Sequence, residues 1–88
     1  MAWSVNFDPR AFSELKKLDP QTQTRIIRFL QEHVAGPENP RRMGKALKGD
    51  KGDLWRYRVG DYPAAGQIQD ERSVVLVLRV ARRREVYR

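Results

Sequence analysis

The stretch LWRYRVGDY, residues 54–62, decides the fold of this chain. Trp55, Tyr57 and Val59 occupy every second position, so they share one face of a β-strand, and the two arginines between them share the other face. The Gly-Asp pair that follows Val59 suits the tight turn of a β-hairpin. The stretch therefore predicts an antiparallel sheet with one apolar face and one basic face.

Two further strands are expected after this turn. Residues 74–80, VVLVLRV, form an apolar run that is typical of a buried strand. Residues 62–69, YPAAGQIQ, are a poorer strand sequence, because proline cannot donate to a ladder and glycine and alanine add little packing. We therefore expect a weakened strand at Pro63-Ala64-Ala65-Gly66.

The N-terminal half predicts one strand and two helices. Residues 3–7 alternate apolar and polar side chains, as a half-buried strand does. Asp8-Pro9 and Asp19-Pro20 each place a capping carboxylate before a proline, which is a helix start signal. The second helix carries apolar residues at three- and four-residue spacing and ends at Gly36-Pro37. The two helices are expected to form an antiparallel hairpin that covers the apolar face of the sheet.

The predicted fold is thus a single α+β domain over residues 1–88. It has an N-terminal strand, a two-helix antiparallel hairpin and three antiparallel strands, in a sheet of about four strands. Residues 37–53 are expected to be a loop with a short turn near Lys45. Trp3 and Trp55 are interpreted as core or interface anchors, and His33 as a structural residue on the apolar side of its helix.

Positive charge is concentrated in the second half of the chain. Residues 1–40 hold five Lys/Arg and five Asp/Glu, whereas residues 41–88 hold thirteen and six, which accounts for the whole net charge of +7. A one-sided field of this kind is typical of a surface that meets a polyanion. Lys45, Lys48 and Lys51 are predicted to face phosphates without reading sequence.

The last residues after the apolar run are the most basic part of the chain. Residues 82–88 read RRREVYR, so four arginines and a tyrosine follow one predicted strand. This composition fits a site for phosphates and bases, with Arg82, Arg84 and Arg88 as nucleic-acid contacts. From the residues alone, a solubilising tail is an equal alternative, and Arg56 and Arg58 are more often a solvated strand face.

Composition excludes several classes of site. The chain has no cysteine and one histidine, so it offers no disulfide, no thiol nucleophile and no spacing for a metal site, and we expect no metal and no cofactor. No signal-like stretch opens the sequence, and no run nears the roughly 20 apolar residues that span a bilayer. We expect a cytoplasmic protein without a membrane partner.

The same residues carry a resemblance to a known family. Residues 54–62, residues 74–80 and the RREVY of residues 83–87 resemble the RelE/ParE superfamily of bacterial toxins, and the helical hairpin and Leu47-Lys48-Gly49 fit as well. The resemblance implies the toxin of a type II toxin–antitoxin system, neutralised by a cognate antitoxin in a hetero-oligomer. RelE-like members cut messenger RNA in the ribosomal A site, and ParE-like members inhibit DNA gyrase.

The resemblance also implies roles for single residues. Arg56 and Arg58 match the paired basic residues of RelE-like toxins, Arg83 the basic residue after the last strand, and Tyr87 the C-terminal catalytic tyrosine. Metal-free cleavage by the 2′-hydroxyl needs a base, an acid and cations for the phosphorane. Arginine, with a pKa above about 12, supplies the cation, and tyrosine, with a reference pKa of about 10, acts as a base where clustered cations lower it.

One departure from the family pattern affects the expected activity. An arginine normally follows the equivalent of Tyr62, and this chain has Pro63 there, followed by Ala64, Ala65 and Gly66. The expected function is therefore a ribosome-dependent messenger RNA endonuclease scaffold that is weakened or inactive. The alternatives are a ParE-like gyrase inhibitor and a non-toxic module that binds antitoxin.

Overall fold

The computed structural model describes residues 2–47 and 54–80 of the chain. Its helices and strands, in chain order, are β1 (Ser4–Phe7), α1 (Pro9–Lys16), α2 (Pro20–Phe29), β2 (Lys45–Ala46), β3 (Leu54–Val59), β4 (Tyr62–Gln69) and β5 (Val74–Val80). A π-helical turn, Leu30–Val34, extends α2, and 3₁₀ turns lie at Pro40–Arg42 and Asp70–Arg72. In the described parts of the chain, no helix is long and apolar enough to cross a bilayer.

The strands form one five-stranded mixed sheet in the order β1-β5-β4-β3-β2. β1 pairs in parallel with β5, and the other neighbours are antiparallel. The predicted α+β class is confirmed. The strand count is one higher than expected because the segment at Lys45, predicted as a turn, pairs with β3 as β2.

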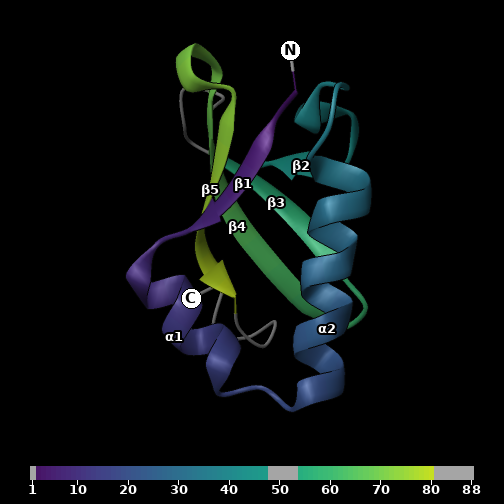
Figure 1. Cartoon of the computed structure of the whole chain (residues 1–88), viewed down its shortest axis with the longest axis vertical. Coiled ribbons are helices and arrows are strands. Elements are labelled where there is room, and N and C mark those ends of the chain that lie inside the picture. The colour runs from purple at the N-terminus through teal and green to yellow at the C-terminus, as the bar shows by residue number, and fades with distance from the viewer. Residues whose placement is uncertain (1, 48–53, 81–88) are drawn as a thin grey trace.

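Both helices begin as the sequence predicts. The Asp8 carboxylate accepts a hydrogen bond from the backbone N–H of Ala11, and the Asp19 carboxylate accepts one from the N–H of Thr22. Each cap satisfies an N–H group that has no partner within its own helix. Figure 1 shows both helices on one side of the sheet, with α2 crossing β3 and β4 and α1 beside the end of β5.

A continuous core lies between the helices and the sheet. Its buried residues come from both layers: Ala11, Leu15, Ile26, Leu30 and Val34 from the helices, and Tyr57, Val59, Ala64, Ile68, Val75, Val77 and Val80 from the sheet. Trp3 and Trp55 pack against this core, as expected.

The poor strand sequence at residues 63–66 nevertheless forms part of a complete strand. β4 is a strand of eight residues with antiparallel partners on both sides, and Pro63 through Gly66 are buried. Val59 faces Tyr62 across the turn, so the next pair, Arg58 with Pro63, falls at a position without hydrogen bonds between β3 and β4. The proline nitrogen therefore occupies a place where β3 requires no donor.

A β-bulge near the end of β5 reverses which side chains face the core. Ala65 pairs with Arg79 and Gly66 with Val77, so Leu78 is left without a partner on β4. Simple alternation after Val77 would turn Arg79 inward. The extra residue instead buries Val80, which is 1% exposed, and leaves Arg79 half-buried.

Candidate functional site

The two arginines of β3 lie on the face of the sheet that the helices do not cover. Tyr57 and Val59 are 1% and 4% exposed in the core, whereas Arg56 is half-buried and Arg58 is exposed on the opposite face. Lys45 of β2 is exposed and stands directly opposite Arg56, so the two share this face. The structure thus brings these three predicted site residues together.

The remaining predicted site residues lie outside the described part of the chain. They are Lys48, Lys51, Arg82, Arg83, Arg84, Tyr87 and Arg88. The described part does fix where β5 ends. Val80 pairs with Ala64, and Ala64 pairs with Tyr57, so Val80 lies two strands from Tyr57, at the level of the arginine pair. Two strand spacings are about 10 Å.

Tyr57 is adjacent to both arginines in sequence and yet has a structural role. Its hydroxyl donates a 2.9 Å hydrogen bond to the carbonyl oxygen of Pro40 in the core. Burial raises the pKa of Tyr57 to about 12, although the positive charge of Arg41 acts in the opposite direction. The phenol is therefore neutral at physiological pH and unsuited to proton abstraction.

A carboxylate on α1 holds the end of β5. Glu14 accepts hydrogen bonds from Arg79 Nε and from the backbone N–H of Val80, each 2.9 Å long, and Arg10 Nε lies 4.0 Å away. This contact holds the last two residues of β5 against α1. Sequence reasoning missed it, because 65 residues separate Glu14 from Arg79 and no local pattern links them.

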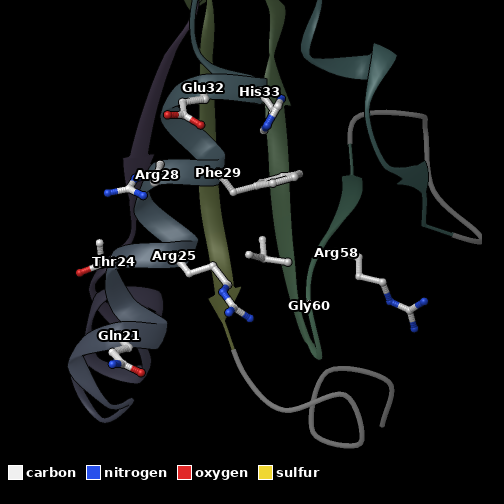
Figure 2. A pocket seen from close by; sticks show the side chains of 10 residues that line it. Gln21, Thr24, Arg25, Arg28, Phe29, Glu32, His33, Arg58 and Gly60 are labelled. Atoms are coloured by element: carbon white, nitrogen blue, oxygen red, sulfur yellow. The ribbon is translucent and has the colours of Figure 1, made fainter.

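A second candidate site lies on the helix side of the molecule. A cleft of about 510 Å³ separates α2 from the end of β3, and its lining comprises Gln21, Thr24, Arg25, Arg28, Phe29, Glu32, His33, Arg58, Val59 and Gly60. In Figure 2, Arg25, Phe29 and His33 extend from α2 toward β3, and Arg58 points away from the cleft. We call this cleft the α2–β3 groove.

His33 does not have the position that the sequence predicted. It was interpreted as a structural residue on the apolar side of its helix, but its side chain is exposed and lines the α2–β3 groove. Its ring stands 5.0 Å from that of Phe29, at an angle of 47°. The π-helical turn that follows Phe29 departs from the 3.6-residue period on which the prediction was based.

A comparison with known protein families shows which family the chain belongs to. Residues 5–87 match the family described as the ParE toxin of the type II toxin–antitoxin system ParDE. The chain belongs to this toxin family. The resemblance to the RelE/ParE superfamily seen in the sequence is therefore confirmed, and the protein is a RelE-like toxin of a type II toxin–antitoxin system.

Two toxins of Mycobacterium tuberculosis are similar along their length. The chain is 31% identical to Toxin RelG over 88 residues, which is 100% of this chain and 99% of RelG. It is 41% identical to Toxin RelE over 88 residues, which is 98% of this chain and 87% of that toxin.

Solved structures of RelE toxins share the fold. A toxin–antitoxin complex RelBE of Mycobacterium tuberculosis superimposes with a TM-score of 0.82 and 29% identity, covering 94% of this chain and 100% of that one. The isolated RelE toxin of E. coli gives a TM-score of 0.75 and 32% identity, covering 98% and 92%. The two helices and the mixed sheet are thus the RelE fold.

Proposed function

We propose that this toxin binds the ribosomal A site in the cytoplasm and acts on messenger RNA through the basic face of its sheet. The observation that carries the proposal is the pairing of Arg56 and Arg58 on one face, with β5 ending about 10 Å away at the same level. Three residues can span at most about 10 Å, so the chain between Val80 and Arg83 is long enough for Arg83 to reach the pair. The similarity to Toxin RelE and Toxin RelG supports the same assignment.

The proposed reaction is attack of the 2′-hydroxyl on the adjacent phosphate, with release of the 5′-oxygen of the next nucleotide. Arg56, Arg58 and Arg83 neutralise the additional negative charge of the phosphorane, since guanidinium groups stay protonated and donate several hydrogen bonds. Tyr87 takes part in proton transfer. The neutral, buried Tyr57 has no part in it.

We further propose that Pro63 weakens cleavage by this chain. Position 63 stands opposite Arg58 on β3, so a side chain there shares the face of the two arginines. An arginine at this position would add a fourth cation to Arg56, Arg58 and Arg83 beside the phosphate. Loss of one transition-state donor typically costs about 10²–10³ in rate.

Primer extension on ribosome-bound messenger RNA tests both proposals. We expect weak or no cleavage by the wild-type chain and cleavage raised at least about 100-fold in Pro63→Arg. Arg58→Ala in the Pro63→Arg background is expected to abolish the gain, and Arg72→Ala, an exposed arginine at the Asp70–Arg72 turn, serves as the control. Equal cleavage by wild type and Pro63→Arg would mean that position 63 is not catalytic.

Inhibition of DNA gyrase is the second candidate function, because the matching family is that of ParE toxins. Gyrase inhibition through protein contacts needs no nuclease site. A supercoiling assay with purified gyrase separates the two functions. Inhibition of supercoiling, together with no cleavage by the folded Pro63→Arg variant, would assign the chain to gyrase. Inactivity in both assays would leave a non-toxic module that binds antitoxin.

A cognate antitoxin is the partner we propose in either case. Two of the similar structures are complexes of RelE with RelB, from Mycobacterium tuberculosis and E. coli. The net charge of +7 indicates an antitoxin whose contact segments are acidic.

A further inference from the structure

We propose that the α2–β3 groove is a docking site for an acidic peptide segment that carries a large apolar side chain, and that the cognate antitoxin supplies this segment. The identity of the partner rests on the proposed function. The groove opens between α2 and β3, and it shares Arg58 with the basic face assigned to RNA, although the Arg58 side chain points away from the groove in Figure 2.

The positive charge of the groove comes from α2. Arg25 and Arg28 are exposed, and within the described residues neither forms an ion pair. In Figure 2, Arg25 extends toward β3, whereas Arg28 points to the other side of the helix, so Arg25 is the cation that faces the groove. Arg25 also lies over the β3–β4 turn: a Cβ built on Gly60 would be 3.3 Å from its Nη1. A carboxylate that enters the groove therefore meets the Arg25 guanidinium next to this turn.

The floor of the groove is apolar. Phe29 is half-buried against the core, and Val59, which is 4% exposed, also contributes to the lining. A volume of about 510 Å³ lies within the range of sites that enclose small ligands, so one or two side chains fit. An apolar side chain inserted between α2 and β3 would gain burial, and the arginines at the rim would orient the chain that carries it.

Two observations favour a peptide over a nucleic acid. The Phe29 ring already contacts His33, at 5.0 Å and 47°, so it is poorly presented as a flat platform for a base. Glu32 also lines the groove and would repel a continuous phosphate backbone. A peptide can place its carboxylates near the arginines and keep uncharged residues near Glu32.

The test measures the affinity of the purified cognate antitoxin for the full-length toxin by biolayer interferometry. Arg25→Glu is compared with Arg72→Glu, an equal change of charge at an exposed position outside the groove, and circular dichroism confirms that each variant is folded. We expect Arg25→Glu to raise Kd at least about 30-fold, mainly through faster dissociation, because it breaks a desolvated charge contact. Arg72→Glu should change Kd less than about threefold. Arg28→Glu, on the other side of the helix in Figure 2, should give an intermediate loss.

Binding of single-stranded oligouridylate is measured on the same variants, and ribosome-dependent cleavage is measured with the same substitutions in the Pro63→Arg background. We expect RNA binding and cleavage to be equal in Arg25→Glu and Arg72→Glu, because Arg25 lies on α2 and the Arg58 side chain points away from the groove. Equal loss of antitoxin affinity in the two variants, or no loss in Arg25→Glu, would overturn the proposal. Retained antitoxin affinity with a selective loss of oligouridylate binding would make the groove a nucleic-acid site instead. If wild type and Pro63→Arg both fail to cleave RNA, the proposed nuclease function fails, and the antitoxin affinities still decide the groove.

Discussion

Tyr57 shows how one strand separates a structural side chain from its functional neighbours. It lies between Arg56 and Arg58 in sequence, but the alternation of the strand directs it into the core and the arginines away from it. Its hydroxyl joins β3 to the carbonyl of Pro40. The phenol thus holds the segment before β2 against the sheet.

We predict that Tyr57→Phe lowers the free energy of unfolding by about 1–2 kcal/mol, because the Pro40 carbonyl loses its buried donor. Urea denaturation at pH 7 measures the change. Tyr62→Phe is the control, since the half-buried Tyr62 hydroxyl forms no hydrogen bond within the described residues, and it should change stability by less than about 0.5 kcal/mol. A cost for Tyr57→Phe no larger than that of the control would contradict the role of this bond.

The same side chain predicts a loss of stability in alkali. The folded pKa of Tyr57, about 12, exceeds its ordinary value of 10.0 because burial disfavours the phenolate. Its contribution is therefore complete below pH 10 and is lost as the pH rises toward 12. Thermal unfolding at pH 9 and pH 11 should show a larger fall in melting temperature for wild type than for Tyr57→Phe.

Asp70 predicts a second pH effect, of the opposite sign. Arg41 donates two hydrogen bonds of 2.9 Å to its carboxylate, and these lower the pKa of Asp70 below its ordinary value of 3.8. The stabilisation is present above pH 3.8 and is lost as the pH falls through the folded pKa. Asp70→Asn should lower the melting temperature at pH 7, and the difference from wild type should shrink at pH 3. Glu71→Gln changes the exposed neighbouring residue, and its difference in melting temperature from wild type should be the same at pH 7 and pH 3.

At the scale of elements, the segment before β3 is held by contacts that its own sequence does not reveal. Pro40 accepts from Tyr57, the Met43 carbonyl accepts from the Trp55 indole, and Leu47 donates to the carbonyl of Leu54. These bonds turn an expected loop into the edge strand β2. Because β2 brings Lys45 beside Arg56, they also extend the basic face.

We predict that Gly44→Ala separates the edge strand β2 from β3. Gly44 has φ +75°, and a Cβ there would overlap the backbone carbonyl of Arg56. The backbone strain and the overlap together should cost about 2 kcal/mol or more in the free energy of unfolding. Gly60→Ala is the matched comparison: its φ is +60°, and the nearest atom to its added Cβ belongs to the flexible Arg25 side chain. If chemical denaturation showed the same loss in the free energy of unfolding for both substitutions, an overlap at Gly44 would be excluded.

The charge distribution acts at the scale of the whole molecule. Residues 41–88 carry the entire net charge of +7, and the described part of this half places Lys45, Arg56 and Arg58 on one face. A partner that neutralises this half must be acidic, and its association should be steered by the field.

We predict that the antitoxin–toxin affinity falls at least about tenfold between 50 and 500 mM salt, because the screening length shortens from roughly 14 Å to 4 Å over that range. At the low end of this salt range, most of the loss of affinity should come from a slower association rate. Surface plasmon resonance at five salt concentrations measures both rates. An affinity that stays constant over this range would refute the electrostatic account.

Several features of the fold could be predicted from local sequence. The Asp-Pro pairs fixed both helix starts, and alternation along residues 54–59 identified the buried and the basic faces. The features that the sequence did not predict involve residues whose partners are far away in the chain. Pro63 suits β4 because of its register with Arg58, and Glu14 meets Arg79 across 65 residues. The Arg25–Phe29–His33 stripe was missed for a related reason, since only the position of β3 turns that side of α2 into a groove.

The sequence by itself determined the α+β class, the caps, the apolar faces and the charge asymmetry, because each of these depends on neighbouring residues and on a fixed period of 2 or 3.6. Only the tertiary structure decided that β2 is a strand, that β4 pairs with a strand on each side, that Val80 rather than Arg79 is buried and that α2 and β3 enclose a groove. The physical reason is that strand register and side-chain contacts between elements are set by packing across the sheet. The sequence pattern predicts which side chains are buried, and the register of the strands then determines which residues they contact.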